Sequence, residues 1–188
     1  MAFDNDFIED EVIQGCIKGD RASQKLLYQR YAKDMFGICK GYSGDTSSAK
    51  DILQDGFIKV FKYLKDYKGG SLEAWIRRII VNTAIDFYRK SVREMNVVEL
   101  EDYVSYVDSD ILEQLNAEDL LKLVQKLPKG ARLIFNLYTI EGYSHKEISE
   151  KLNISVGTSK SQVNRARSLL QNWILQFYDL KPYAVREA

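Results

Sequence analysis

The stretch YSHKEISEKLNISVGTSKSQVNRARSLL, residues 143–170, predicts two short helices joined by a tight turn. Ser144 and Glu147 have the spacing of a capping box, in which each side chain bonds the other residue's backbone N–H, so a helix is expected to begin here. Asn153 tolerates the left-handed conformation that ends a helix, and Ser155 is placed to cap the next one. Together these signals predict a helix-turn-helix.

The second of these helices divides into an apolar and a polar side at about 100° per residue. The apolar side is expected to hold Val156, Ser159, Val163, Ala166 and Leu170, and the polar side Lys160, Ser161, Asn164, Arg165, Arg167 and Ser168. The polar side has cations and no carboxylate, whereas a helix that needs only solubility usually mixes both signs. This composition favours contact with an anion, through side chains that also read base edges. The alternative is a helix-turn-helix used only for packing, because the αα turn alone is common.

Charge is balanced overall, with 27 basic and 27 acidic residues in 188, but it is unevenly distributed. Residues 67–90 and residues 145–170 each sum to +3, whereas residues 91–120 sum to −8 and residues 1–13 to −5. Two basic segments separated by an acidic one indicate two surfaces for a polyanion, joined by a segment that avoids it.

Several function classes are excluded by what the sequence lacks. No apolar run is long enough to span a bilayer, and residues 1–11 are acidic rather than a basic leader, so we expect a cytoplasmic protein. Cys16 and Cys39 lack metal-ligand spacing, which indicates reduced, structural thiols. His145, the only histidine, is expected to be an exposed neutral imidazole. Because no catalytic set, phosphate loop or metal cluster is present in the sequence, neither an enzyme nor a cofactor is predicted.

Helical spacing of apolar residues recurs along the chain and strand-like alternation does not persist, so the predicted fold class is all-α. Besides the helix-turn-helix, helices are expected over residues 6–19, 20–42, 49–64, 71–90, 117–126 and 131–140. Helix caps are expected from Asp20, from Ser47 or Ser48, and from Ser71.

The same periodicity predicts the domain organisation. A helical domain is expected over residues 1–92, an acidic linker over residues 93–116, and the helix-turn-helix domain over residues 117–188. The apolar positions assigned to the two cores include Ile17, Leu26 and Leu120.

The helix expected over residues 49–64 has a polar face with one apolar residue on it. This face carries Asp51, Gln54, Asp55 and Ile58. An isoleucine ringed by polar side chains resembles a small hot spot with a polar rim, so these residues are predicted to bind a partner. The alternative is an ordinary exposed isoleucine, which protein surfaces often carry.

The helix expected over residues 71–90 has a second stripe beside its buried one. This stripe consists of Trp75, Arg78, Asn82, Asp86 and Arg89. An aromatic ring, an amide and two guanidiniums along one line suit unstacked single-stranded bases, because stacking gives affinity, amides read base edges and arginines hold phosphates. For Trp75 the alternative is that the ring fills the core.

Three stretches together resemble one family. DILQDGFIKVFKYL (51–64), SLEAWIRRIIVNTAIDFYRK (71–90) and LPKGARLIFNLYTIEGYSHKEISEKLNISVGTSKSQVNRARSLL (127–170) are similar to segments of bacterial sigma factors, most of all of the small extracytoplasmic-function (ECF) group. The resemblance covers nearly all of the chain apart from the linker and the ends, and the order of the three stretches makes it specific. It implies two helical domains, sigma region 2 and sigma region 4, with the acidic linker passing near the RNA exit path of the polymerase.

The resemblance also implies roles for single residues. Asp51, Gln54, Asp55 and Ile58 would bind the polymerase core, Asn82 and Asp86 would face bases of the melted minus-ten element, and Arg78 and Arg89 would hold its backbone. Lys160, Ser161, Gln162, Asn164, Arg165 and Arg167 would read the minus-thirty-five element as duplex. Many relatives have a more basic helix here, which implies weaker phosphate binding by this one. The loop over residues 67–71 would capture a flipped-out base, although it is one residue shorter than in some relatives.

The implied function is promoter recognition and DNA-templated transcription initiation, with the chemistry left to the polymerase. The implied partners are RNA polymerase core, through its β′ clamp helices and β flap, promoter DNA, and an anti-sigma factor, with no small-molecule substrate. The runner-up is a ligand-responsive regulator that binds duplex DNA alone as a dimer. In that function the stripe from Trp75 to Arg89 and the exposed Ile58 would have no role. A third alternative, an all-α enzyme, lacks a catalytic site in the sequence.

Overall fold

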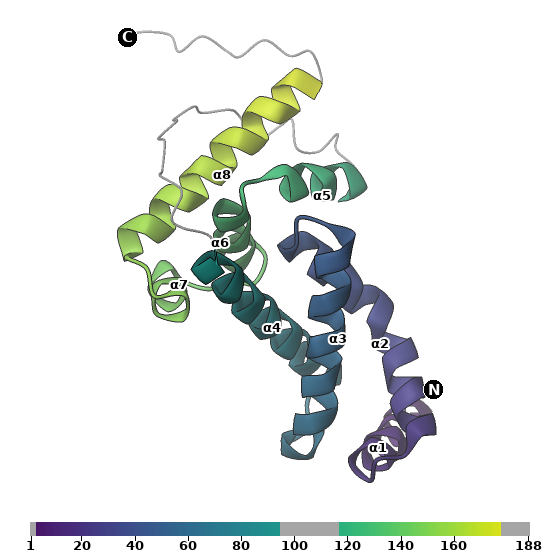
Figure 1. Ribbon diagram of the computed structural model, residues 1–188. Helices are drawn as coiled ribbons and strands as arrows, with labels where there is room; N and C mark the ends of the chain where they lie inside the picture. Colours follow the sequence, from purple (N-terminus) through teal and green to yellow (C-terminus); the bar gives the residue numbers. More distant parts are fainter. Residues whose placement is uncertain (1–2, 95–116, 178–188) are drawn as a thin grey trace, which may run out of the picture. The chain divides into compact units, whose positions relative to one another are not determined.

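A computed structural model describes residues 3–94 and 117–177, and every regular element within those ranges is a helix (Figure 1). The all-α prediction is therefore confirmed. The chain divides into two compact units, residues 1–87 and residues 88–188, which we call the N-terminal and the C-terminal unit. The acidic linker expected over residues 93–116 lies almost wholly outside the described residues.

Four α-helices begin in the N-terminal unit, and acidic or hydroxyl side chains cap three of them. The helices are α1 (Phe3–Ile17), α2 (Arg21–Tyr42), α3 (Thr46–Tyr63), followed by a 3-10 turn (Leu64–Asp66), and α4 (Leu72–Glu94). Asp20 caps α2 as predicted, because its carboxylate accepts from the backbone N–H of Ser23 at 2.8 Å. Ser71 caps α4 by accepting from Ala74 N–H at 3.2 Å.

The prediction of a serine cap for α3 is wrong. The cap is Asp45, whose carboxylate accepts from the backbone N–H of Ser48 at 2.8 Å and from its hydroxyl at 2.7 Å. Ser48 is therefore the donor of this cap, and the helix begins at Thr46. A carboxylate is favoured over a hydroxyl here because it accepts both hydrogen bonds and also complements the positive end of the helix dipole.

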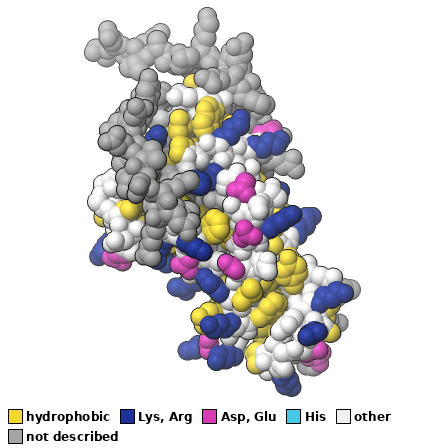
Figure 2. All heavy atoms as spheres, viewed as in Figure 1, with side chains coloured by type: hydrophobic (Ala, Val, Ile, Leu, Met, Phe, Trp, Pro, Cys, Tyr) yellow, Lys and Arg dark blue, Asp and Glu magenta, His cyan; other side chains and the backbone are white. Residues whose placement is uncertain are grey.

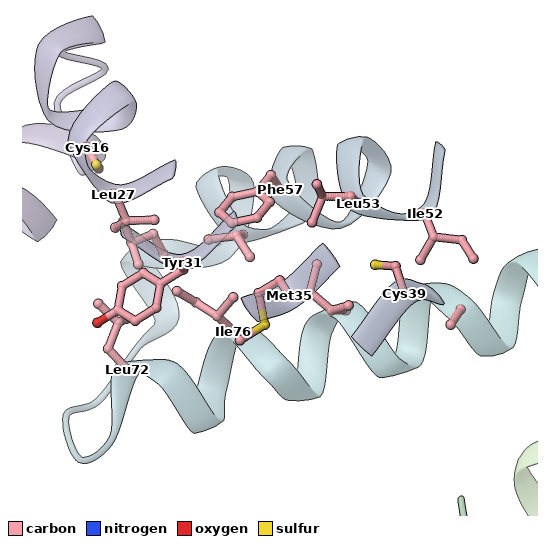
Figure 3. Packing of buried hydrophobic residues seen from close by; sticks show 14 of the residues in the cluster. Cys16, Leu27, Tyr31, Met35, Cys39, Ile52, Leu53, Phe57, Leu72 and Ile76 are labelled. Atoms are coloured by element: carbon pink, nitrogen blue, oxygen red, sulfur yellow. The ribbon is translucent and has the colours of Figure 1, made fainter. Parts of the chain in front are cut away.

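Apolar side chains from α2, α3 and α4 meet in the core of the N-terminal unit, where Met35 lies beside Ile76, and Ile52 lies further along beside Cys39 (Figure 3). All four are at most 1% exposed. Gly56 allows α3 to approach α4 closely, because an added Cβ would lie 2.3 Å from Cδ1 of Ile80. The end of the Ile80 side chain therefore occupies the space that a side chain at position 56 would need.

Two of the predicted apolar core positions in this unit are exposed. Leu26 is 56% exposed and Ile17 is 41% exposed, whereas the neighbouring Leu27 and Cys16 are buried. One residue corresponds to about 100° around a helix, so two consecutive apolar residues do not both face a narrow core.

The C-terminal unit contains α5 (Ala117–Lys126), α6 (Lys129–Thr139), α7 (His145–Leu152) and α8 (Val156–Phe177), the long yellow-green helix of Figure 1. Its core joins α5, α6 and α8 through buried apolar residues: Leu123, Val124, Leu127, Ala131, Ala166, Leu170 and Ile174. Leu120 was predicted to pack here but is 38% exposed, because α5 turns only one narrow face toward α8.

A buried arginine holds the end of α5. The guanidinium of Arg132, on α6, donates to the backbone carbonyls of Gln125 and Leu127. Its side chain is buried, with only 3% of the residue exposed. The last carbonyls of a helix have no partner within the helix, so Arg132 supplies the hydrogen bonds that α5 itself cannot.

The caps and the turn of the predicted helix-turn-helix are confirmed. Ser144 and Glu147 form the capping box of α7, and Asn153 ends that helix with a φ of 55°. Ser155 then caps α8 by accepting from Thr158 N–H at 2.9 Å. Each of these features involves residues three or four positions apart, so it depends little on the rest of the chain.

The division of α8 into two sides is confirmed only in part. Ser159, Val163, Ala166 and Leu170 are buried as expected, but Val156 is 40% exposed and Ser168 only 6% exposed. Val156 begins the helix, where few neighbours cover it. Ser168 was assigned to the polar side because a single apolar stripe was assumed. The helix contacts α5, α6 and α7, so it is covered on more than one side.

Candidate nucleic-acid interface and apolar groove

The exposed row of α8 consists of Lys160, Asn164 and Arg167. Their spacing of four and three residues places them on one line along the helix. Arg165 is partly buried and leaves the helix on another side. Because α8 contains no Asp or Glu, the field along this row is set by cations and an amide. Such a row suits phosphate oxygens and base edges of a duplex.

Two other residues of the predicted duplex-reading set, Ser161 and Gln162, are less accessible from solvent than the exposed row. Gln162 is only 6% exposed, because it lies at the edge of the buried face formed by Ser159 and Val163. Ser161 is partly buried, and its hydroxyl donates to the carbonyl of Thr158 at 3.1 Å. The structure therefore brings together three of the six predicted residues in one exposed row.

His145 was expected to be an exposed imidazole, and the structure corrects this. Its ring stacks on Tyr138 of α6, with centroids 4.3 Å apart and an angle of 11° between the planes. Its Nδ1 lies 3.0 Å from the hydroxyl of Ser159, a fully buried residue of α8. Ser159 was the one sequence signal for this contact, because a buried hydroxyl on an apolar helix face needs a hydrogen-bond partner.

The surroundings of His145 disfavour its charged form. Burial lowers the pKa of the imidazole, and the cations of Lys160 and Arg167 lower it further. The guanidinium of Arg167 also lies 5.8 Å from the ring centroid of Tyr138. The stacked pair of His145 and Tyr138 thus lies directly beside the exposed row of α8.

The stripe on α4 faces solvent at Arg78 and Asp86, whereas Asn82 and Arg89 are partly buried. Trp75 packs against the core of the N-terminal unit, with its centroid 5.6 Å from the ring of Tyr67. Of the two alternatives for Trp75, this placement matches core packing, with part of the ring left accessible.

Asp86 has a partner that the sequence did not indicate. Its carboxylate forms an ion pair with the ammonium of Lys59 on α3, with Nζ and Oδ2 2.9 Å apart. The side chains of Asp86 and Lys59 are 58% and 37% exposed, so water screens the pair. The bond joins the stripe on α4 to the neighbouring helix α3.

The loop before α4 is tied across its own turn. Gly69 and Gly70 have φ values of 92° and 95°, which L-residues with a side chain rarely adopt. The hydroxyl of Tyr67 donates to the carbonyl of Gly70 at 2.6 Å. Residues 67–71, the predicted base-capturing loop, are therefore held in a defined shape at the start of α4.

The polar face of α3 is as the sequence predicts. Ile58 is 57% exposed, and Asp51, Gln54 and Asp55 around it are exposed as well. Figure 2 shows hydrophobic side chains gathered among Lys and Arg over the lower part of the view, where α1, α2 and α3 lie.

An apolar groove of about 720 Å³ lies between α2 and α3 and includes Ile58 at its edge. Its lining consists of Tyr28, Ala32, Lys33, Phe36, Lys50, Leu53, Gln54, Phe57, Ile58 and Phe61. The rings of Tyr28 and Phe57 meet edge to face at 4.7 Å between centroids. Sequence analysis found only the α3 side of this surface, because tertiary packing is what brings α2 beside it.

Among the described residues no helix is both long and apolar enough to cross a membrane. Within the same ranges no group of three His, Cys, Asp or Glu side chains is arranged to hold a metal ion. Cys16 and Cys39 are free, buried thiols as predicted, and burial raises the pKa of Cys39 to about 12.

Both units match known family models. The model for sigma-70 region 2 matches residues 27–94, and the model for sigma-70 region 4 matches residues 117–170. The ECF RNA polymerase sigma factor SigE of Mycolicibacterium smegmatis is 30% identical over 169 residues, which cover 83% of this chain and 64% of that protein. The ECF RNA polymerase sigma-E factor of Escherichia coli K12 is 28% identical over 171 residues, which cover 82% of this chain and 88% of that protein.

The chain therefore belongs to the sigma-70 family of RNA polymerase sigma factors, in its ECF group. Sigma factors are transcription initiation factors and not enzymes. Among solved structures, the complex of the sigma factor RpoE with the anti-sigma factor NepR from Bartonella quintana is similar to this chain. The two chains are 23% identical, and their alignment covers 81% of this chain and 96% of the other, with a TM-score of 0.47.

Proposed function

We propose that this chain directs RNA polymerase to promoters, with the N-terminal unit binding the polymerase core and melted DNA and the C-terminal unit binding duplex DNA. The observation that carries this proposal is the order of the two matched regions, together with an α8 that presents Lys160, Asn164 and Arg167 and no carboxylate. Neither unit alone accounts for both features.

The proposed contact with the polymerase is the groove between α2 and α3 together with the α3 face of Asp51, Gln54, Asp55 and Ile58. An apolar centre with a polar rim has the composition of a binding hot spot. The partner that we propose for it is the β′ clamp helices, because a groove between two helices accepts the apolar side of another helix. The groove adds Tyr28 and Phe61 to the predicted set.

The proposed minus-ten surface is the α4 stripe of Trp75, Arg78, Asn82, Asp86 and Arg89, with the loop over residues 67–71 before it. The exposed guanidinium of Arg78 is suited to hold a phosphate, and the amide of Asn82 is suited to read the edge of an unstacked base. The ion pair with Lys59 keeps Asp86 at a set position on this surface.

The proposed minus-thirty-five surface is α8, from Lys160 and Ser161 through Asn164 to Arg165 and Arg167. We expect Lys160, Asn164 and Arg167 to make the largest contribution, because they are exposed along one line. For Gln162 we propose a contact only if DNA binding turns its side chain outward, since it is buried in this structure.

The other proposed partners are the β flap of the polymerase and an anti-sigma factor. We propose that the protein works in the cytoplasm, where the polymerase and the chromosome lie. No small-molecule substrate and no cofactor is part of this function.

A selection from random DNA tests the proposal. RNA polymerase core alone, the chain alone, and both together would each be used to enrich duplexes from a random library. We expect only the mixture to enrich two sequence blocks separated by a constant spacer. The free chain should enrich nothing at physiological salt, because each basic segment sums to only +3. Enrichment of a palindrome by the free chain would show the ligand-responsive regulator instead.

A further inference from the structure

Three helices of the C-terminal unit meet on the imidazole of His145. The ring is carried by the first residue of α7, it stacks on Tyr138 of α6 at 4.3 Å, and its Nδ1 lies 3.0 Å from the hydroxyl of Ser159 on α8. Ser159 is fully buried, so its hydroxyl has no water to replace this bond. The imidazole therefore fixes the first helix of the helix-turn-helix against the second.

The charged groups around the ring come mainly from α8. Lys160 and Arg167 are the cations that act on the imidazole, and α6 contributes the neutral phenol of Tyr138. On α7 itself the carboxylate of Glu147 is held by hydrogen bonds to the backbone N–H and the hydroxyl of Ser144. Within the described part of the chain, the pKa of His145 is therefore shifted by burial and by cations, and not by a carboxylate.

The same two cations belong to the exposed row proposed to bind DNA. When a phosphate approaches Lys160 and Arg167, it offsets the repulsion that these cations exert on an imidazolium. The phosphate also attracts a positive charge directly. Protonation would not break the contacts of the ring, because Nδ1–H of an imidazolium donates to the hydroxyl oxygen of Ser159 and a cationic ring stacks on Tyr138.

We propose that His145 is a positioning residue of the duplex-reading surface, and that it takes up a proton when this surface binds DNA phosphates. This inference rests on the proposed function of α8. Proton uptake is expected because the surroundings of His145 differ between the free chain and the DNA complex. In the free chain burial and the two cations lower the pKa of His145, whereas in the complex phosphates raise it. The affinity for duplex DNA therefore rises as the pH falls from the higher of the two pKa values to the lower one.

His145 is the only histidine of the chain, so its ring signal in an NMR spectrum is unambiguous. The test is to titrate this signal in the full chain, free and bound to a short mixed-sequence duplex at low ionic strength. We expect a pKa below the ordinary histidine value in the free chain and a higher pKa in the complex. Each unit of difference corresponds to about a tenfold change in affinity across that range. An equal pKa in both states would overturn the proposal.

Matched variants separate positioning from charge. His145→Asn keeps a hydrogen-bonding atom near the place of Nδ1 but loses the stack on Tyr138 and does not titrate, so we expect weaker duplex binding at high pH and no pH dependence. Ser159→Ala removes the bond, so we expect weaker binding at every pH with the pH dependence retained. A pH dependence that persists in His145→Asn would overturn the assignment to His145. The titration of the unmodified chain decides the matter even if a variant folds poorly.

Failure of this inference can be told apart from failure of the proposed function. Lys160→Ala and Arg167→Ala should each weaken duplex binding and reduce its salt dependence by about one counterion. If both variants bind DNA as the unmodified chain does, the proposed role of α8 is wrong. If they weaken binding while the pKa of His145 does not change on binding, only the role of His145 is wrong.

Discussion

The two units form their candidate surfaces in different ways. In the C-terminal unit one helix, α8, carries the exposed row of Lys160, Asn164 and Arg167. In the N-terminal unit the groove needs α2 and α3 together, and the α4 stripe is tied to α3 through the pair of Lys59 and Asp86. The spacing of a row on one helix is set by that helix, whereas a groove between two helices exists only when both helices are packed together. The second kind is therefore more sensitive to substitution.

The largest effect is expected at the groove. Ile58→Glu combined with Gln54→Ala places a charge where the polymerase would remove water, which costs several kcal/mol at a binding hot spot. We expect binding to RNA polymerase core, measured by fluorescence anisotropy of labelled chain, to be lost at micromolar concentration. Helix content measured by circular dichroism should not change, because Ile58 is 57% exposed.

Leu26→Glu is the matched control for this experiment. Leu26 is also an exposed aliphatic residue of the N-terminal unit, at 56%, but it does not line the groove. Its substitution should leave core binding unchanged. Equal losses in both variants would mean that general surface charge, and not the groove, decides the binding.

The next prediction separates the two units by the step that fails. Arg165→Ala in the C-terminal unit should weaken the closed promoter complex by about 1–3 kcal/mol if the guanidinium meets a base. Asn82→Ala in the N-terminal unit should leave the closed complex nearly intact and reduce strand opening, because its stripe is proposed to meet melted bases. Gel shifts report closed complexes and permanganate footprints report open ones. The assigned division between the units fails if both variants lose closed complexes equally.

A smaller effect is expected at the ion pair between α3 and α4. Because both side chains are more than a third exposed, a double-mutant cycle of Lys59→Ala and Asp86→Ala should give a coupling below about 1 kcal/mol in the free energy of unfolding. Promoter opening should respond more strongly to Asp86→Ala than to Lys59→Ala, since only Asp86 belongs to the proposed DNA surface. Equal responses would make the pair merely structural.

The smallest effect concerns two helix caps, one in each unit. The hydroxyl and backbone N–H of Ser23 lower the pKa of Asp20, and the backbone N–H and hydroxyl of Ser144 lower that of Glu147. A lowered carboxyl pKa gives stability that is complete above the ordinary pKa of the group and is lost as the pH falls through the folded-state value. Both caps should therefore weaken in acid.

Asp20→Asn and Glu147→Gln test this with little change of shape, because both amides still cap a helix and do not titrate. Urea unfolding at neutral and at acidic pH should show a smaller loss of stability in each variant than in the unmodified chain. A loss of the same size in the variants would assign the acid sensitivity to other carboxylates.

The sequence predicted best what is local. The capping box of Ser144 and Glu147, the left-handed Asn153 and the exposure of Ile58 depend on residues a few positions apart. The start of α3 was missed although its signal was also local, because Asp45 competes with two nearby serines for the same role.

What depends on tertiary packing could not be predicted. The α2 side of the groove, Tyr28 included, needs the position of α2 beside α3. The environment of His145 needs Tyr138 and Ser159, which other helices supply. From helical periodicity we predicted one buried stripe on α8. Ser168 lies outside that stripe but is buried as well. Helical periodicity also gives no information about contacts between helices, so the ion pair of Asp86 with Lys59 on α3 could not be predicted.

The buried guanidinium of Arg132 has a consequence for how the C-terminal unit opens. Because a side chain of α6 holds the terminal carbonyls of α5, the last turn of α5 cannot fray without exposing Arg132. Amide protons at the end of α5 should therefore exchange with solvent at the rate of those in α6, and not at the fast rate usual for a helix end. We therefore expect α5 and α6 to open together as one cooperative element, which includes the turn at Pro128 between them.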